Sequence, residues 1–279
     1  MDIDLLRTFL EVHRTRHFGQ AADNLFVTQS AVSARIKLLE ETLGVPLFTR
    51  TRSNIQLTPM GQRFLRYAES LVTTWNRARQ DVAAEREDAV LLAVGGVPSL
   101  WDIVLQAWLD WVYVGFPDAH VNAEVTGSDV ILRRLLDGTL DLGFFFEAPQ
   151  VGGLQAVPIM SVPLILVCSR PGVSVSEALG KDYVLVDWGT SFGLAHAQHY
   201  PDLPLPRLRM GLGRLARDFL LTQGGAAYLA EPMVARELAE GRLFRVEGAA
   251  VIDRPACAVY ALGSDRADLI RRSLGFFGA

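Results

Sequence analysis

Apolar side chains recur every three or four residues in three stretches at the start of the chain, and this spacing predicts three helices. The stretches are residues 2–14, 18–26 and 28–43. Thr28 is suited to cap the third helix and Gly44 to end it, because a hydroxyl accepts a free backbone N–H and glycine tolerates a left-handed conformation. The pattern therefore predicts a small three-helix unit.

A tight turn joins the second and third predicted helices, since only Phe26 and Val27 lie between them. Helices joined this closely cross steeply, and Ala21, Ala22 and Ala31 supply the small side chains that such a crossing needs. The pattern favours a helix-turn-helix, whose second helix presents its polar side to the DNA major groove. An ordinary three-helix bundle with a polar surface is the alternative.

The polar side of the helix predicted at 28–43 carries side chains that suit DNA. Glutamine pairs with an adenine edge, serine with a groove wall or a phosphate, and arginine and lysine with guanine or phosphate. The candidate contacts are Thr28, Gln29, Ser30, Ser33, Arg35 and Lys37.

Residues 47–58 read as two short extended arms around Ser53 and Asn54. Arg50 and Arg52 lie at this hairpin, where a basic side chain reaches phosphate or a narrow minor groove. The alternative is a solvated hairpin whose arginines have no such role.

A repeat of about 3.5 residues, which is typical of a coiled-coil seam, follows the hairpin. Thr58 and Pro59 predict the start of this helix, as a hydroxyl cap followed by proline at the first helical position. The stripe consists of Phe64, Ala68, Leu71, Trp75, Ala78 and Val82. It predicts a dimerisation helix, with packing on its own chain as the alternative.

From residue 90 onward, short apolar runs alternate with helical patterns. Strand–helix–strand alternation points to parallel sheets that are covered on both faces. The runs form two sets, with crossings between them expected near residues 160 and 262. The second set has strands at 163–168, 183–187, 208–212, 226–230 and 255–262, and helices at 192–199, 214–222, 232–239 and 265–274.

Two α/β lobes leave a cleft at the carboxyl ends of their strands, where small ligands bind. Helix N-termini with adjacent hydroxyls suit a carboxylate or a similar anion. The candidate ligand contacts are Ser99, Thr126, Ser128, Phe144, Trp188 and Thr190. No Lys or Arg lies in these runs, so any anion would rely mainly on backbone dipoles. We expect a small effector that is weakly charged or aromatic. Helix caps and core packing are the competing explanation for these residues.

Composition narrows the class of protein. Half of the 279 residues are apolar, which supports two domains and excludes a disordered chain. No apolar run is long enough for a membrane span and the acidic start is unlike a signal peptide, so a cytoplasmic location is expected. The formal net charge is −4, but residues 1–58 carry +1 with basic residues clustered between Arg35 and Arg52. That clustering is typical of a local anion-binding module, or of a solvated helix face.

The chain carries few signs of catalysis. Cys168 and Cys257 lie in apolar runs, which indicates buried reduced thiols rather than a disulfide. His196 and His199 have the spacing of a metal pair, yet no further ligand cluster accompanies them, so structural roles are favoured. The sequence lacks a P-loop and the strict G-x-G-x-x-G dinucleotide-binding motif. We expect no enzyme activity, no catalytic residues, no metal and no cofactor.

Several runs in the first 50 residues together resemble the LysR-type transcriptional regulators in order and spacing. They are LLRTFLEV at 5–12, AADNL at 21–25, TQSAVS at 28–33, LE at 39–40, LGV at 43–45 and LFTR at 47–50. The run from Arg14 to Gly19, the segment from Trp75 to Arg79 and the short length are similar to an HdfR-like branch. His17 and Gly19 depart from the family's usual polar residues, which leaves Gln20 as the expected polar contact of the second helix.

The resemblance implies an all-α winged helix-turn-helix domain at 1–58, with the arms at 47–58 as its wing. A linker helix at 59–89 follows, and then a two-lobed α/β domain at 90–279 that is similar to type 2 periplasmic binding proteins. Lobe I is expected at about 90–161 and 263–279, and lobe II at about 162–262. The runs LLDGTLDL at 135–142 and GGAAYL at 224–229 are similar to the family's effector domain.

The function implied is a sequence-specific regulator that binds an interrupted dyad in duplex DNA. Its partners would be a second copy of the chain, joined antiparallel along the linker helix into a dimer or tetramer, and a small-molecule effector. RNA polymerase is a further candidate partner. The alternative is a regulator without an effector, whose lobes serve only for oligomerisation. A plain solute-binding protein fits less well, since it would need an export signal and no DNA-binding unit.

Overall fold

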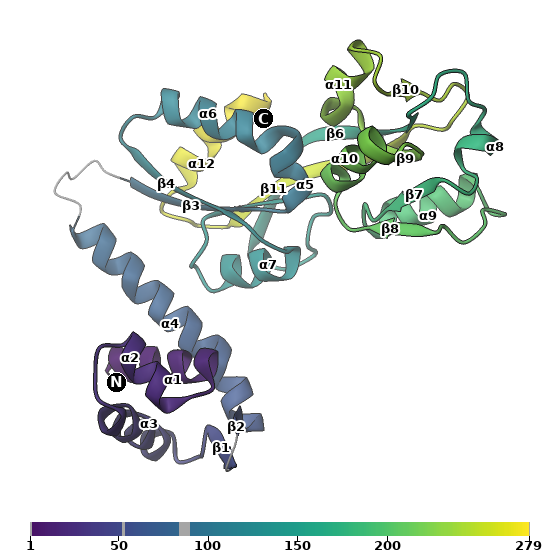
Figure 1. The fold of residues 1–279 in the computed structure, drawn as a ribbon. Helices are drawn as coiled ribbons and strands as arrows, with labels where there is room; N and C mark the ends of the chain where they lie inside the picture. The colour runs from purple at the N-terminus through teal and green to yellow at the C-terminus, as the bar shows by residue number, and fades with distance from the viewer. Residues whose placement is uncertain (1, 52–53, 84–89, 279) are drawn as a thin grey trace. The chain divides into compact units, whose positions relative to one another are not determined.

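The computed structural model describes residues 2–51, 54–83 and 90–278 (Figure 1). The chain divides into two compact units, which hold mainly Met1–Ala89 and, in two pieces, Val90–Leu136 with Leu140–Ala279. Among the described residues, none of the helices combines the length and the apolar character that a membrane crossing requires.

The first unit opens with the three expected helices, α1 (Ile3–Thr15), α2 (Phe18–Asn24) and α3 (Gln29–Leu43). Helix α2 ends earlier than its apolar pattern suggests, because the chain turns at Phe26, which has a positive φ of 56°. The Phe26 side chain is 95% exposed instead of joining the apolar face of α2. The tight turn that the sequence predicts between α2 and α3 is confirmed.

The predicted hairpin is also present as strands β1 (Phe48–Thr51) and β2 (Asn54–Leu57), which pair antiparallel. The long helix α4 (Pro59–Ala83) follows directly. The ring of Phe9 lies at the centre of this unit, with its centroid 5.3 Å from the rings of both Phe48 and Phe64. The hairpin and α4 therefore share one core with the three helices.

The second unit is built on a nine-stranded sheet whose longest path runs β4-β3-β5-β11-β6-β9-β7-β8, with the short β10 beside β6. The strands are β3 (Val90–Gly96), β4 (Ala119–Val125), β5 (Leu142–Phe145), β6 (Leu154–Cys168), β7 (Tyr183–Val186), β8 (Leu208–Met210), β9 (Ala226–Ala230), β10 (Phe244–Arg245) and β11 (Ile252–Ala261).

The expected parallel pairing holds only at the two ends of this sheet. Strands β3, β4 and β5 are parallel to one another, as are β7, β8 and β9. The long strands β6 and β11 between them pair antiparallel with each other and with their neighbours. The sheet is therefore mixed where parallel pairing was expected, because two strands that span both halves must run in opposite directions to leave one half and return.

Helices cover the sheet on both sides (Figure 1). They are α5 (Pro98–Leu100), α6 (Gln106–Gly115), α7 (Ser128–Leu136), α8 (Val175–Ala178), α9 (Thr190–His199), α10 (Gly213–Gln223), α11 (Glu231–Ala239) and α12 (Ala267–Leu274). A π-helical turn, η1 (Trp101–Leu105), joins α5 to α6, and a 3-10 turn, η2 (Gly275–Phe277), follows α12.

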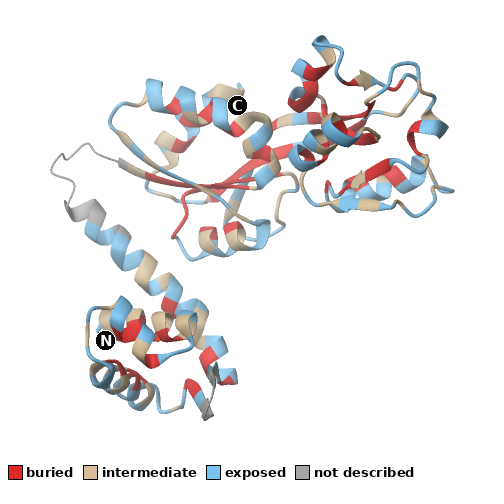
Figure 2. Cartoon of the chain, viewed as in Figure 1, coloured by how far each residue is buried: buried red, intermediate tan, exposed pale blue. Residues whose placement is uncertain are grey.

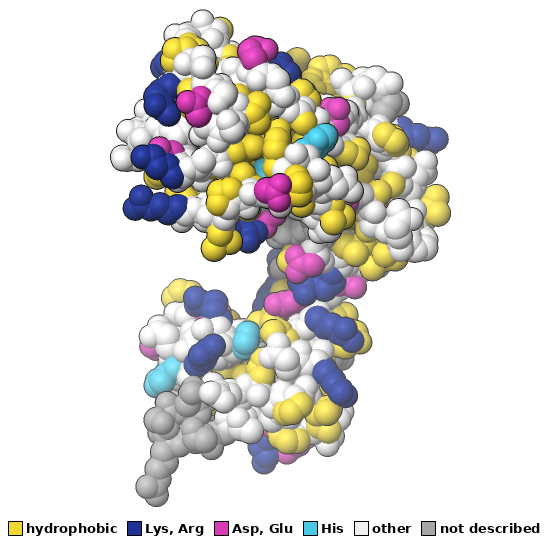
Figure 3. All heavy atoms as spheres, turned by 90° about the vertical axis from the view of Figure 1, so that its right-hand side faces the viewer, with side chains coloured by type: hydrophobic (Ala, Val, Ile, Leu, Met, Phe, Trp, Pro, Cys, Tyr) yellow, Lys and Arg dark blue, Asp and Glu magenta, His cyan; other side chains and the backbone are white. Residues whose placement is uncertain are grey.

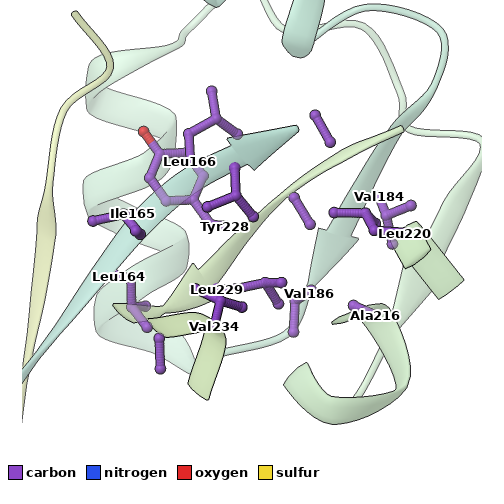
Figure 4. Packing of buried hydrophobic residues seen from close by; sticks show 14 of the residues in the cluster. Leu164, Ile165, Leu166, Val184, Val186, Ala216, Leu220, Tyr228, Leu229 and Val234 are labelled. Carbon is purple, nitrogen blue, oxygen red and sulfur yellow. The ribbon is translucent and has the colours of Figure 1, made fainter. Parts of the chain in front are cut away.

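The strands carry many of the buried residues (Figure 2), and the two halves of this unit have separate cores. Figure 4 shows the core of the second half, where Leu166, Val184 and Tyr228 pack from adjacent strands. Along β11, Ile252 belongs to this core while Ala256 belongs to the other. The return crossing therefore lies within β11, earlier than the position expected near residue 262.

A histidine is buried in the core of the second half. His196 is 6% exposed, its Nε2 lies 2.9 Å from the hydroxyl of Tyr183, and the two rings are stacked. Burial, with a smaller effect from the charge of His199, lowers the pKa of His196 below its ordinary value of 6.5. The folded protein therefore holds this imidazole neutral at a pH where the unfolded chain protonates it.

We expect the unfolding free energy to fall as the pH drops below 6.5. The unfolded state then binds a proton at His196, whereas the lowered pKa keeps this side chain neutral in the native state. One such group contributes at most about 1.4 kcal/mol per pH unit. Denaturant unfolding of His196→Phe between about pH 5 and pH 7 should show a shallower slope than the wild type. The exposed His120→Gln, on β4 in the other half of the unit, serves as control. Equal slopes for the wild type and His196→Phe would contradict the assignment.

Candidate nucleic-acid interface and ligand cleft

Helix α3 is capped at both ends by the residues that its sequence predicts. The Thr28 hydroxyl accepts the N–H of Ala31 at 3.2 Å, and Gly44 ends the helix with a left-handed φ of 72°. Val32, Ile36 and Leu39 are fully buried against the rest of the unit. Of the predicted contacts, Gln29, Ser30 and Lys37 are exposed and Ser33 is half-buried. The chain thus leaves one polar side of a rigidly seated helix open.

The two basic residues of α3 have different surroundings. The ammonium of Lys37 is in solvent, 3.6 Å from the carboxylate of Glu41 one turn later. Arg35 instead reaches back to α1, where Nη1 donates to the hydroxyl of Thr8 at 3.4 Å and Nη2 lies 3.9 Å from Asp4. In the described structure, Arg35 therefore fixes the orientation of α3 on α1.

His17 performs the capping role that its departure from the family pattern had put in question. Its Nδ1 accepts the backbone N–H of Gln20 at 3.1 Å, so an imidazole replaces the usual hydroxyl at the start of α2. The side chain of Gln20 is exposed and donates to Asn24 at 3.2 Å. Gln20 thus lies on the surface beside the turn that leads into α3.

The wing is attached to α3 by the carboxylate of Glu40, a role that the sequence pattern did not predict. Glu40 Oε1 accepts the backbone N–H of Leu47 at 2.7 Å and that of Phe48 at 3.1 Å. Arg50 is described only as a strand position opposite Ile55, and Arg52 lies outside the described residues. On the face seen in Figure 3, the basic side chains of the smaller unit are separated by uncharged surface rather than massed.

The apolar stripe of α4 divides into two parts. Ala68 is fully buried and Phe64 packs on Phe9, so both belong to the core of their own unit. Leu71 is 42% and Trp75 46% exposed, and Ala78 is also exposed. The side chain of Val82 lies outside the described residues. The second part of the stripe is thus an apolar surface without a cover in the described chain.

The second unit contains a cleft of about 600 Å³, lined by residues from both of its halves. Four of the predicted contacts line it, namely Ser99, Ser128, Trp188 and Thr190. Thr126 does not line it, although its neighbour Gly127 does. Phe144 is fully buried, with its ring 5.0 Å from that of Trp108, so it belongs to the core; Phe146 takes its place at the cleft.

The cleft also holds charged side chains that sequence reasoning missed. Arg254 of β11 lines it and is only 3% exposed, and its guanidinium lies 4.7 Å above the ring of Phe146. Glu147 and Asp187 line it as well. The expectation that an anion would rely mainly on backbone dipoles is therefore wrong. Strand alternation offered the missing signal, because Arg254 shares a face with the buried Ile252 and Ala256.

Glu147 joins the two sides of the cleft. Its Oε1 accepts the amide of Ser191 at 3.2 Å and the hydroxyl of Ser191 at 2.7 Å, and lies 3.7 Å from Nη2 of Arg254. The hydrogen bonds from Ser191, helped by the charge of Arg254, hold the pKa of this carboxyl below its usual range. Burial lowers the pKa of Arg254, while Glu147 and Asp187 act in the opposite direction.

Within the described ranges, no group of His, Cys, Asp and Glu has the arrangement of a metal site. Cys168 and Cys257 are free and buried, and burial raises the pKa of the Cys257 thiol to about 11. A thiol with so high a pKa remains protonated near neutral pH and is a poor nucleophile.

Comparisons with known proteins agree with this architecture. A family model described as "Bacterial regulatory helix-turn-helix protein, lysR family" matches residues 3–62, and one described as "LysR substrate binding domain" matches residues 86–278. The HTH-type transcriptional regulator HdfR of Yersinia enterocolitica is 37% identical, over 98% of this chain and 95% of its own. HdfR of Salmonella schwarzengrund is 38% identical, over 97% and 96% of the two chains.

The fold also matches solved structures of low sequence identity. Full-length CbnR, crystallised with its target DNA, aligns with a TM-score of 0.80 at 21% identity, over 99% of this chain and 100% of its own. ArgP of Mycobacterium tuberculosis aligns with a TM-score of 0.62 at 22% identity, over 100% and 98%. The fold class expected from the sequence is confirmed. The chain belongs to the LysR family of bacterial DNA-binding transcriptional regulators, with an N-terminal helix-turn-helix domain and a C-terminal substrate-binding domain.

Proposed function

We propose that this regulator binds an interrupted dyad in duplex DNA as a homodimer, or as a tetramer of two dimers, and that a small-molecule effector controls it. The observation that carries the DNA-binding part is the capped helix α3, whose polar side stays open while Val32, Ile36 and Leu39 hold its other side in the core. A rigid helix of this kind fits the major groove. CbnR, which shares this fold and has been crystallised with its target DNA, supports the same use of the fold.

The proposed contacts follow from the chemistry of each side chain. Gln29 reads a base edge, and Lys37 binds phosphate or guanine. Ser30 and Ser33 contact the groove wall or backbone, with Gln20 and Thr28 beside them at the entrance to α3. Arg50 and Arg52 on the wing bind phosphate or the minor groove. Arg35 orients α3, since its guanidinium already bonds α1.

For dimerisation we propose an antiparallel pairing along α4. Leu71, Trp75 and Ala78 supply exposed apolar surface at coiled-coil spacing. Residues 1–58, 59–89 and 90–279 then act as DNA-binding, linker and regulatory segments. A twofold particle presents two copies of α3 to two half-sites, which is why the site is expected to be a dyad.

For regulation we propose that an effector binds in the cleft and shifts the population of two arrangements of the lobes. The cleft is lined by both halves of the unit, whose cores are separate, and its lining combines helix N-termini, aromatic walls and a buried guanidinium. RNA polymerase is the partner through which a changed arrangement would act on transcription. A regulator whose lobes serve only for oligomerisation is the second candidate, and it predicts that no small molecule alters the affinity for DNA.

Two substitutions in α3 test the DNA-binding part. Lys37→Ala should weaken binding to all duplexes alike and reduce the slope of log affinity against log salt by about one, as the loss of one phosphate contact does. Gln29→Ala should instead cost about 1–3 kcal/mol on the cognate site and little on random duplex. Fluorescence anisotropy over a salt series on both duplexes measures the two effects. An equal loss on both duplexes for Gln29→Ala would contradict base reading.

A further inference from the structure

The cleft of the second unit contains an oxyanion site that the chain fills with one of its own side chains. Glu147 follows β5 in one half, while Ser191 lies in the first turn of α9 in the other half. The Glu147 carboxylate accepts both the amide and the hydroxyl of Ser191. These donors, together with the start of the ten-residue helix α9, are the groups that bind anions in proteins. Glu147 therefore occupies the position that a carboxylate ligand would take.

Arg254 is the second and independent sign of an anion site. Only 3% of the Arg254 surface is exposed. Its Nε and Nη1 have no hydrogen-bond partner within the part of the chain that the structure describes. A buried cation costs free energy unless it is paired, and the single carboxylate at 3.7 Å satisfies it incompletely. The guanidinium lies against Phe146 and against Gly189, where a Cβ atom would come within 2.9 Å of Nη1.

The charges of the lining restrict the class of ligand. Glu147 and Asp187 are both acidic and outnumber Arg254, so a multiply charged anion such as phosphate would be repelled. A single carboxylate that replaces Glu147 leaves the charge around Arg254 unchanged. The rest of the cleft, about 600 Å³ with Phe146 and Trp188 in its wall, has room for an apolar or aromatic remainder.

We propose that the effector of this regulator is a small monocarboxylate, which displaces the carboxylate of Glu147 from Ser191 and Arg254. This proposal rests on the proposed function only in taking the cleft as an effector site. The displacement removes a direct bond between the two halves of the domain and replaces it with one made through the ligand. Effector binding would in this way change the arrangement of the lobes without moving any element of either core.

Chemical rescue tests the site before the natural effector is known. In the full-length protein, Glu147→Ala removes the built-in carboxylate and leaves Ser191 and Arg254 without it. Sodium acetate in low-chloride buffer should then raise the Tm of Glu147→Ala by about 3 °C at tenfold excess over its dissociation constant. Acetamide, which has the same shape and no charge, should not. The wild type should respond to acetate much less, because Glu147 competes.

The double variant Glu147→Ala/Arg254→Met is the matched control and should lose the rescue. If Glu147→Ala does not fold, Glu147→Gln keeps the volume of the side chain and should bind benzoate at least tenfold more tightly than the wild type, by calorimetry. Equal effects of acetate and acetamide, rescue by phosphate instead of acetate, or no rescue at all would overturn the proposal. The measurement needs no DNA, so a failure of the proposed DNA binding would leave its outcome unaffected.

Discussion

Replacing Trp75 by glutamate is expected to weaken DNA binding by a factor on the order of 10² to 10⁴, although Trp75 lies far from the polar side of α3 in sequence. In the proposed dimer each DNA-binding unit would bind one half-site, and linkage of the two units would supply the second contact at high effective concentration. A carboxylate placed in an apolar seam is buried without a partner when the seam closes, so the dimer dissociates. Trp75 is 46% exposed in the single chain, so the unit itself should still fold.

Sedimentation and gel-shift titration of the full-length protein check this prediction. Thr73→Glu adds the same charge to α4 on the side opposite Trp75 and serves as the control. We expect Trp75→Glu to sediment as a monomer and Thr73→Glu as the wild-type assembly. A dimeric Trp75→Glu protein with full affinity for DNA would show that the exposed part of the stripe is not the seam.

Replacing Gly61 by alanine is expected to destabilise the DNA-binding unit by about 3 kcal/mol. A Cβ atom at Gly61 would lie 2.1 Å from the carbonyl oxygen of Leu47, and the same oxygen accepts the N–H of Thr58. The position of the new Cβ is fixed by the backbone of α4, and the atom that it meets is a backbone oxygen, so no side-chain rotation relieves the clash. The link between the wing and the start of α4 must then open, and DNA binding should fall with it.

Gly193→Ala provides a control of the opposite sign. Gly193 lies inside helix α9 without a positive φ, and beyond its own stretch of helix no atom of the described residues lies within 4 Å of a built Cβ. Alanine there should therefore stabilise the protein by up to about 1 kcal/mol. Denaturant unfolding with probes in both units measures the two variants. A Gly61→Ala protein as stable as the wild type would mean that α4 moves away from Leu47 at little cost.

Local chemistry explains why much of this fold could be predicted from the sequence. Thr28, Gly44 and Thr58 act through hydrogen bonds and conformations within a few residues, and each caps a helix or ends it as expected. The spacing of apolar residues predicted the helices of the first unit and the strands of the second, because this spacing is also a property of neighbouring residues. These features depend on neighbours along the chain, which the sequence displays directly.

Contacts between distant segments account for the parts that were missed. Arg35 lies on the expected helix, but its partners are on α1, 27 positions away in the case of Thr8. Phe64 and Ala68 fit a seam by spacing, yet α1 covers them within the same chain. Arg254 and Glu147 meet only because β11 returns beside β5, a pairing that no local pattern specifies.

In vitro selection from a random duplex pool with the full-length protein tests the central claim most directly, since it requires both a reading helix and a twofold particle. The account predicts enriched sequences that share an inverted repeat, with half-sites separated by about one helical turn of 10–10.5 base pairs or a multiple of it. Gln29→Ala should relax the preference at one position of each half-site. Enriched sequences without twofold symmetry, or no enrichment over the starting pool at low salt, would contradict it.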